Sequence, residues 1–184
     1  GELEIHPATP KDQPDREVLR IVHGPNSRGM ENAWHSDVTW REQPSLGSIL
    51  RAIELPEVGG DTLFSNMVMA YEDLDEDLKT RLCGMTAVHD IARVFAKRLG
   101  KDAAALHEKF PLMEHPVVRT HPETGQRLLY VNTAFTDHIK GLDRDESDTL
   151  LKFLYSRAAI PEYQCRFRWA LGSIAFWDNR ACQH

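Results

Sequence analysis

The sequence predicts a mainly β protein with inserted helices, arranged as a double-stranded β-helix, or jelly roll. Three observations support this class. Short apolar stretches alternate as in strands, helical patterns stand between them at irregular intervals, and the regular strand–helix repeat of a parallel sheet is missing. Since no linker or low-complexity tract interrupts the 184 residues, we expect a single domain over residues 1–184.

The first half of the chain reads as two strands followed by helices. Residues 48–55 (SILRAIEL) alternate as in a strand with both faces partly covered, PEVGG turns the chain, and residues 61–66 (DTLFSN) form the next strand. From Tyr71 onward, leucines at 74, 78 and 82 recur at helical spacing among charged residues and predict an amphipathic surface helix. Residues 102–110 (DAAALHEKF) predict a second, shorter helix.

The second half returns to strands around one helix. Residues 116–121 and 127–132 predict a hairpin closed by the turn PETGQ. Asp143 and Glu146 have the spacing of a helix cap pair and open a helix that runs through Leu154. Two final strands are expected at 163–169 (YQCRFRW) and 173–178 (SIAFWD).

The composition excludes several functional classes. With 22 basic against 28 acidic residues and no basic block, the chain lacks the charge pattern of a nucleic-acid-binding protein. No apolar run approaches the roughly 20 residues needed to span a bilayer, so we expect no membrane partner. The three cysteines, Cys83, Cys165 and Cys182, are widely separated and predict free thiols in a reducing compartment such as the cytoplasm. A Cys182/His184 metal pair is conceivable, but the sequence offers it no thiolate partner.

The first candidate site is the segment NAWHSDVTW, in which one residue separates His35 from Asp37. On an extended strand such residues point to the same side, so an imidazole and a carboxylate can converge on one ion. Two histidines and one carboxylate on one face are the ligand set of a non-haem iron site. His121 and Glu123 have the same spacing, but they lie in the proline-containing turn, and we interpret them as solvated turn residues.

Three motifs in order along the chain resemble one enzyme family. WHSD at 34–37, GGDT at 59–62 and WDNRACQH at 177–184 are similar to motifs of the taurine dioxygenase family of iron(II)- and 2-oxoglutarate-dependent oxygenases. That family carries W-H-x-D, G-G-D-T and W-D-N-R-x-x-x-H at comparable separations. HPVVRTHPETG followed by LYVN also resembles the stretch between them, so that the resemblance extends over nearly the whole chain.

The resemblance implies a metal centre and a co-substrate. By it, His35, Asp37 and His184 bind Fe(II), Thr62 contacts the carboxylate of 2-oxoglutarate, and O2 is the oxidant. The alternative for Thr62 is a β-branched residue that only begins a strand. The family also pairs 2-oxoglutarate with an arginine about a dozen residues beyond the last histidine, a bidentate contact that lysine makes poorly. Because this sequence has no residue there, we expect a domain that is incomplete at its C-terminus rather than a non-functional fragment. The acidic start GELEIHP is typical of mid-domain sequence, so we expect a chain truncated at both ends.

The resemblance further implies a pocket for a small anionic organic substrate. The residues that match its lining are His6, Val38, Phe95 and Phe135. The alternatives are that both phenylalanines belong to the core and that His6 is a turn residue. The pattern departs from the family at Thr9, Glu31 and Val94, where the amine of taurine would be held. Glu31 could bind an ammonium group, or it could exclude taurine.

We therefore expect an enzyme that hydroxylates a small sulfonate such as taurine and releases sulfite, an aldehyde, succinate and CO2. Alkyl sulfate esters and aryloxyacids are alternative substrates within the family. Two alternatives come from other classes: a zinc-dependent hydrolase that uses the same three ligands with Glu31 as base, and a non-catalytic binding protein. We also expect a homo-oligomer.

Overall fold

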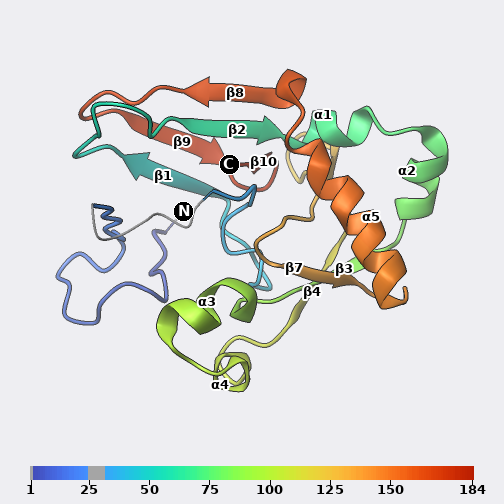
Figure 1. The fold of residues 1–184 in the computed structure, drawn as a ribbon, viewed down its shortest axis with the longest axis horizontal. Helices are drawn as coiled ribbons and strands as arrows, with labels where there is room; N and C mark the ends of the chain where they lie inside the picture. The colour runs from blue at the N-terminus through green and yellow to red at the C-terminus, as the bar shows by residue number, and fades with distance from the viewer. Residues whose placement is uncertain (1, 25–31) are drawn as a thin grey trace. The chain divides into compact units, whose positions relative to one another are not determined.

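Ten strands and five α-helices form in the part of the chain that the computed structural model describes, residues 2–24 and 32–184 (Figure 1). The chain divides into two units, Gly1–Asn32 and Ala33–His184. The described residues of the first unit form turns, in which the Thr9 N–H donates to the carbonyl of His6 (2.9 Å). All the helices and strands belong to the second unit.

The strands are short and the helices vary in length. The strands are β1 (Gly47–Arg51), β2 (Thr62–Asn66), β3 (Thr86–His89), β4 (Met113–Pro116), β5 (Val118–Thr120), β6 (Arg127–Leu129), β7 (Thr136–Ile139), β8 (Gln164–Phe167), β9 (Ile174–Asp178) and β10 (Cys182–Gln183). The helices are α1 (Met67–Glu72), α2 (Glu76–Leu82), α3 (Ala92–Leu99), α4 (Ala103–His107) and α5 (Arg144–Arg157), with a 3-10 turn at Pro161–Tyr163. No helix among the described residues combines the length and the apolar character that crossing a membrane requires.

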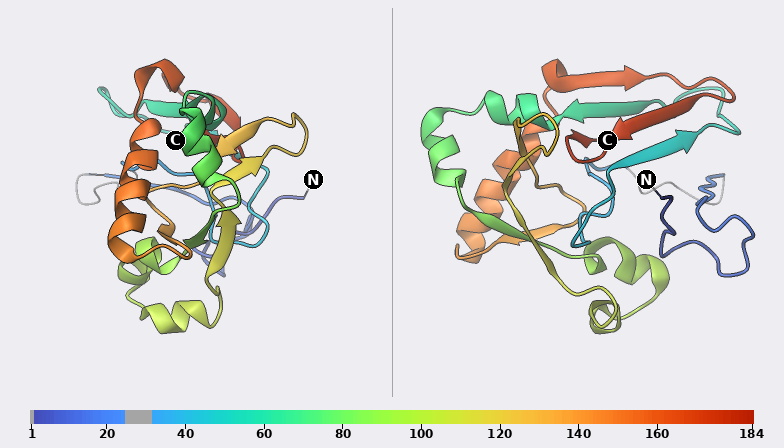
Figure 2. Two further views of the ribbon diagram at one scale, coloured as in Figure 1. Left: turned by 90° about the vertical axis from the view of Figure 1, so that its right-hand side faces the viewer. Right: turned by 180° about the vertical axis from the view of Figure 1, so that it is seen from behind.

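Every strand pair in the second unit is antiparallel. The pairs build four small sheets, with strand orders β1-β9, β10-β2-β8, β4-β3-β7 and β5-β6. Figures 1 and 2 show β1-β9 beside β10-β2-β8, while β4-β3-β7 lies toward α3 and α4. The expectation of antiparallel strands with inserted helices is therefore confirmed.

Most of the expected strands form, but the one at 48–55 is shorter and more exposed than predicted. It ends at Arg51, because Ala52 pairs with the turn before β9: its N–H donates to Ser173 (2.9 Å). Its outer face is not covered, since Ile49 is 61% exposed opposite an equally exposed Phe176. The hairpin of β5 and β6 and the strands β2, β8 and β9 agree with the prediction.

The prediction of one continuous helix from Tyr71 through Leu82 is wrong. The helical segment is divided into α1 and α2, because Asp75 accepts a hydrogen bond from the Leu78 N–H (2.7 Å) and caps a new helix there. Asn66 caps α1 in the same way. The helix α4 is shorter than expected, whereas α5 begins as predicted, with Asp143 accepting from the Glu146 N–H (2.8 Å).

The apolar core lies between α1, α5 and the β5-β6 hairpin. Its fully buried side chains include Met67, Leu128, Ile139 and Leu154. Ile139 ends β7, and the Tyr155 hydroxyl of α5 donates to the Thr136 carbonyl at the other end of that strand (3.1 Å). The core therefore fixes β7 against α5, and β7 in turn carries the segment that reaches the site described below.

A second buried cluster is polar and surrounds His89 on β3. The His89 ring is fully buried, and its Nδ1 shares a hydrogen bond with the Thr39 hydroxyl (2.9 Å). The rings of His115 and Tyr130 pack on it, and the Arg119 guanidinium lies 4.3 Å above the Tyr130 ring. Burial, followed by the charges of His115 and Arg119, lowers the pKa of His89 to about 3. The imidazole is therefore neutral in the folded protein.

Acid should destabilise the protein through this histidine. The unfolded chain protonates His89 near its ordinary pKa of 6.5, whereas the folded protein resists protonation down to about 3, so the unfolded state binds more protons between these values. We expect His89 alone to lower the free energy of unfolding by up to about 1.4 kcal/mol per pH unit in that window. Urea unfolding between about pH 5 and 7 should show a smaller slope in His89→Gln than in wild type. Equal slopes would contradict the assignment, and His138→Gln, a partly exposed histidine on the neighbouring β7, is the control.

Candidate metal centre

His35, Asp37 and His184 converge on one point of the second unit. Asp37 Oδ1 lies 3.6 Å from His35 Nε2 and 4.0 Å from His184 Nε2. The two imidazole rings lie side by side with centroids 4.3 Å apart, and one ligand atom from each of the three residues lies within 4.8 Å of the others. All three side chains are partly buried. The structure thus brings together the three residues predicted as metal ligands.

Backbone hydrogen bonds hold the two histidines in register. The His35 N–H donates to the His184 carbonyl (3.1 Å), and the His184 N–H donates to the His35 carbonyl (2.9 Å). The preceding strand β10 pairs with β2, and the buried Gln183 amide donates to the Val131 carbonyl (2.8 Å). The imidazoles are therefore placed by a paired backbone. The sequence predicted an extended strand around Asp37, but a turn begins at that residue instead.

Asn179 clamps this turn from the end of β9. Its Oδ1 accepts from the Asp37 N–H (2.6 Å), and its Nδ2 donates to the carbonyls of Asp37 (2.9 Å) and Ser45 (3.2 Å). Val38, the next residue, has φ of +49°, which is costly for a β-branched side chain. The Asn179 side chain is fully buried and satisfies both backbone groups of Asp37, so it compensates for a strained turn directly beside a ligand.

The orientation of the ligand atoms is also specified. His35 Nδ1 donates to the Ala33 carbonyl (2.8 Å), which turns the ring so that Nε2 faces Asp37 Oδ1 (3.6 Å). The Ser48 hydroxyl donates to Asp37 Oδ2 (2.6 Å), which leaves Oδ1 directed toward the two imidazoles. Each of these contacts aims a ligand atom at the common point.

The protonation states suit a divalent cation. Burial alone would raise the pKa of Asp37. Hydrogen bonds from His35 and Ser48 and the nearby charge of His184 have the larger combined effect and lower this pKa to about 2. Burial lowers the pKa of His184 to about 4, although Asp37 opposes the shift. At neutral pH the cluster is therefore a carboxylate with a neutral His184 imidazole, the form that binds metal without first losing protons.

The spacing fits a single ion. Metal–nitrogen and metal–oxygen bonds of about 2.0 to 2.2 Å span at most about 4 Å between two ligand atoms. The separations of 3.6 and 4.0 Å lie within that limit. Neighbouring ligand atoms of a facial set lie about 3 Å apart at these bond lengths, so binding would draw the side chains together by up to about 1 Å. Two imidazole nitrogens and one carboxylate oxygen form the facial set that binds non-haem Fe(II) and leaves the opposite positions for other ligands.

Aromatic side chains surround the metal ligands. The Trp177 and Phe64 rings lie 4.7 and 6.0 Å from the His184 ring. The Phe135 ring meets the His35 ring edge-on at 6.4 Å, and Phe95 of α3 stacks on Phe135 at 6.5 Å. Both phenylalanines named by the sequence analysis are thus buried and connected to the centre, and their role in binding substrate stays a prediction.

The other predicted site residues are placed less directly. Thr62 begins β2 and points to the same face as Phe64, two residues on, and its Oγ1 accepts from the Trp169 indole (3.0 Å). Val38 is buried beside Asp37. His6 lies in the first unit, where its Nδ1 accepts from the Ala8 N–H (3.1 Å), and Glu31 lies outside the described residues. The substrate-binding roles of these residues stay predictions.

A second cluster of metal-binding residue types, His121, Glu123 and Asp178, is occupied by internal contacts. His121 Nδ1 accepts two backbone N–H groups, from Glu123 (3.3 Å) and Thr124 (3.2 Å), and its Nε2 donates to Asp178 (3.0 Å). The Arg180 guanidinium contacts both carboxylates and lowers the pKa of Asp178 to about 2. Neither His121 nitrogen is available to an ion.

The structure does not support two of the interpretations made for His121 and Cys182. The interpretation of His121 as a solvated turn residue is wrong: the residue begins the expected turn, but its ring is buried against Asp178. The conceivable metal pair of Cys182 and His184 gains no support, because burial raises the pKa of the Cys182 thiol to about 12. All three cysteines are free thiols, as expected.

Two residues that hold Asp37 were not assigned a role from the sequence. Asn179 stands inside WDNR, where an Asp-Asn pair reads as a turn, and only its buried contacts reveal the clamp. Ser48 opens the segment expected as a strand, with no pattern to mark it as a partner of Asp37. Both contacts join segments far apart in the sequence.

Comparison with known proteins identifies relatives of one type. The family model described as taurine catabolism dioxygenase TauD, TfdA family matches residues 1–184. An alpha-ketoglutarate-dependent sulfate ester dioxygenase of Pseudomonas putida is 35% identical over 192 residues, covering all of this chain and 63% of that protein. An alpha-ketoglutarate-dependent 2,4-dichlorophenoxyacetate dioxygenase of Burkholderia sp. (strain RASC) is 35% identical over 152 residues, covering 82% of this chain and 51% of that protein.

Solved structures agree with these relatives. The crystal structure of a taurine dioxygenase from Burkholderia xenovorans has a TM-score of 0.71 and 40% identity, covering 83% of this chain and 49% of that one. The crystal structure of AAD-2 in complex with Mn(II) and N-oxalylglycine has a TM-score of 0.74 and 29% identity, covering 82% and 55%. The chain therefore spans less than two thirds of the length of each of these proteins.

Substitution of Asp37 should abolish metal binding. Asp37→Ala removes the only carboxylate of the centre, and since loss of an outer hydrogen-bond partner alone costs about 10- to 100-fold in metal affinity, we expect a loss of at least about 100-fold. Anaerobic calorimetric titration with Fe(II) or Mn(II) measures the affinity. His121→Gln, in the cluster occupied by internal contacts, is the matched control and should retain wild-type affinity. A reversed result would move the metal site to His121.

Proposed function

The chain belongs to the taurine catabolism dioxygenase TauD, TfdA family, and we propose that it carries the iron centre of an Fe(II)- and 2-oxoglutarate-dependent dioxygenase. The observation that carries the proposal is the convergence of His35, Asp37 and His184, with one ligand atom of each within 4.8 Å of the others. The family comparison gives no support to the zinc hydrolase or the binding protein.

In the proposed enzyme, the described residues would bind the metal, the co-substrate and the substrate. His35, Asp37 and His184 would hold Fe(II), and Thr62 would contact a carboxylate of 2-oxoglutarate. When bound, iron with 2-oxoglutarate and O2 supplies the oxidising power for hydroxylation of a C–H bond, with release of succinate and CO2. The protein's own part is to fix the ligands, to keep Asp37 ionised, and to hold the substrate against the aromatic side chains.

The Thr62 assignment has structural support from β2. Thr62 shares its strand face with Phe64, whose ring lies 6.0 Å from that of His184. The Trp169 indole N–H donates to Thr62 Oγ1 (3.0 Å), which orients the hydroxyl and leaves its own proton free to donate to a carboxylate.

We propose a small sulfonate such as taurine as the substrate, with alkyl sulfate esters and aryloxyacids as the competing candidates. The stacked rings of Phe95 and Phe135 form an apolar wall beside His35, which suits the carbon portion of any of the three. Val94, in place of a hydroxyl-bearing residue, offers nothing to hold an amine, so we expect an alkyl sulfonate without an amine to be accepted as well as taurine. Hydroxylation at the carbon that bears the sulfonate yields sulfite and an aldehyde.

A double-stranded β-helix remains the architecture that we propose for the complete enzyme. The side-by-side antiparallel sheets β1-β9 and β10-β2-β8 support it, because the ligands lie where these sheets meet the 33–46 segment. A homo-oligomer stays a prediction.

The substrate class is tested by measuring products. The full-length protein, loaded with Fe(II) and supplied with 2-oxoglutarate and O2, should form succinate and one sulfite per succinate with taurine or an alkyl sulfonate. Hexyl sulfate and 2,4-dichlorophenoxyacetate are the comparison substrates. Turnover with hexyl sulfate or 2,4-dichlorophenoxyacetate, but with neither sulfonate, would replace the sulfonate proposal. If iron-loaded protein forms no succinate with any of these substrates, the result would count against the dioxygenase function itself.

A further inference from the structure

A buried polar chain connects the segment of the metal ligands to the aromatic wall. Thr39 follows Asp37 by two residues and is fully buried, and Asn132, 2% exposed, follows the strand β6. The Asn132 Nδ2 donates to Thr39 Oγ1 (3.2 Å), and the Thr39 hydroxyl can then donate to the neutral His89 ring at Nδ1 (2.9 Å). Thr39 thus accepts from Asn132 and donates to His89, so its hydroxyl connects the two.

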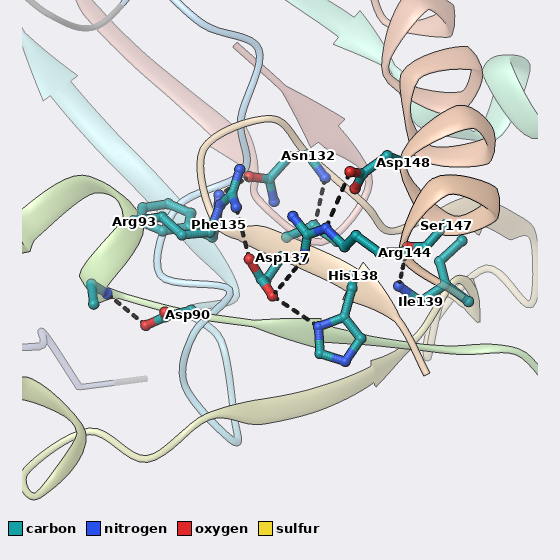
Figure 3. A network of polar contacts seen from close by, with 12 residues as sticks. Asp90, Arg93, Asn132, Phe135, Asp137, His138, Ile139, Arg144, Ser147 and Asp148 are labelled. Carbon is teal, nitrogen blue, oxygen red and sulfur yellow. Dashed lines mark hydrogen bonds and ion pairs between the residues drawn. The ribbon is translucent and has the colours of Figure 1, made fainter. Parts of the chain in front are cut away.

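The same amide holds Phe135. Asn132 Oδ1 accepts from the Phe135 N–H (2.9 Å), while the Asn132 N–H donates to the Thr136 hydroxyl (2.9 Å) (Figure 3). The Asn132 carbonyl also accepts from the Thr136 N–H (3.2 Å). The turn that carries Phe135 is thus closed on itself at the start of β7.

Phe135 is the point at which this turn reaches the metal centre. Its ring meets His35 at 6.4 Å, and Phe95 stacks on its other side. The helix α3 that carries Phe95 is held to β7 by the ion pair of Arg93 with Asp137 (2.9 Å), which Arg144 of α5 also contacts (3.3 Å) (Figure 3). The turn has two further contacts: the Thr133 hydroxyl donates to the Trp34 carbonyl (2.9 Å), and the Asp90 N–H donates to the Phe135 carbonyl (2.8 Å). Among these supports, Asn132 is the one that joins the Phe135 N–H to the segment of Asp37 through Thr39.

We propose that Asn132 is a positioning residue, which fixes Phe135 relative to the segment of Asp37 through Thr39 and thereby sets where the reacting carbon of the substrate lies. The proposal rests on the dioxygenase function given above. The amide accepts from the Phe135 N–H and donates to Thr39 Oγ1, so the proton of the Thr39 hydroxyl stays available to His89. An ionised carboxylate has no proton to donate and would have to take the Thr39 proton instead. A misplacement of about 1 Å is enough to cost about 100-fold in rate, so loss of the clamp would be felt in the reaction rather than in iron binding.

The chain offers a matched control at the other end of the same strand. Ser147, fully buried on α5, accepts from the Ile139 N–H (2.9 Å), just as Asn132 accepts from the Phe135 N–H (2.9 Å) (Figure 3). Ser147→Ala removes one buried acceptor from β7 without approaching Phe135. Any effect common to Ser147→Ala and Asn132→Ala reflects general loss of stability.

The first readout needs neither metal nor turnover. Amide hydrogen exchange of the metal-free, full-length protein should accelerate about tenfold or more at Phe135 in Asn132→Ala, and at Ile139 in Ser147→Ala. Thr39→Val, which keeps the shape of the side chain but removes its hydroxyl, should also accelerate exchange at Phe135, and Thr39→Ser should restore protection. The Thr39 pair decides the question if Asn132→Ala does not fold.

The second readout is the ratio of oxidised substrate to succinate. Asn132→Ala and Thr39→Val should keep Fe(II) affinity within about threefold, because Asn179 and Ser48 still hold Asp37, but the ratio should fall to about half of wild type or less. Thr39→Ser and Ser147→Ala should keep the wild-type ratio. Faster exchange at Phe135 in Asn132→Ala with an unchanged ratio of oxidised substrate to succinate would show that Asn132 has only a structural role. Unchanged exchange at Phe135 would show that Asn132 does not hold this residue. If wild type forms no succinate, the dioxygenase function fails, while exchange still decides whether Asn132 and Thr39 hold Phe135.

Discussion

The two reciprocal hydrogen bonds between the backbones of His35 and His184 are the constraint on which the centre depends. Neither residue lies within a long strand, and side-chain rotation alone would allow the imidazoles many relative positions. The backbone pairing reduces them to neighbours at 4.3 Å. The strand β10 transmits this placement to β2, and through β2 to β8, so the small central sheet determines where the second histidine lies.

Holding a carboxylate in this partly buried position requires compensation. Burial alone would raise the pKa of Asp37 and favour its neutral form, which binds metal poorly. The effect of burial is outweighed by the hydrogen bonds from His35 and Ser48 together with the nearby charge of His184. The Asn179 amide satisfies the backbone N–H and carbonyl of Asp37. The polar contacts also retain Val38 in a left-handed conformation that its β-branched side chain disfavours. The strained backbone at Val38 therefore lies directly beside Asp37, where the contacts of Asn179 stabilise it.

The sequence predicted those features that depend on local pattern or on motifs. The β5-β6 hairpin, β8, β9 and the start of α5 follow from alternation, turn residues and the cap at Asp143. The strands β3, β7 and β10 were missed because they are two to four residues long and because buried polar residues, such as His89 and Thr136, interrupt their apolar pattern. The helix α3 was missed although Gly100, in a left-handed conformation after it, is an ordinary stop signal.

For the site, the motifs named the three proposed ligands, which the structure brings together, but not the residues that hold them. Asn179 and Ser48 act on Asp37 from distant parts of the chain, and His121 carried the same H-x-acid spacing as His35. What separates the two histidines is what surrounds their rings: both nitrogens of His121 are hydrogen-bonded to protein groups and its neighbouring carboxylates contact Arg180, whereas His35 Nε2 faces Asp37 beside the ring of His184. Spacing along the chain carries no information about that difference, because it depends on which groups the fold brings to each ring.

The centre and its aromatic wall are built on different principles, and the difference has a functional consequence. Backbone pairing, the Asn179 amide and the Ser48 hydroxyl hold the ligands, and none of these contacts involves a side chain of the wall. The wall instead consists of Phe135 and Phe95, whose rings are carried by a turn and a helix outside the sheet of β2. Substitution in the wall can therefore change which carbon skeleton fits without moving the ligand atoms. A family whose members bear the names of sulfate ester and aryloxyacid dioxygenases can vary its substrates around one metal centre on this basis, provided that a connection such as the Asn132 amide keeps the two parts in register.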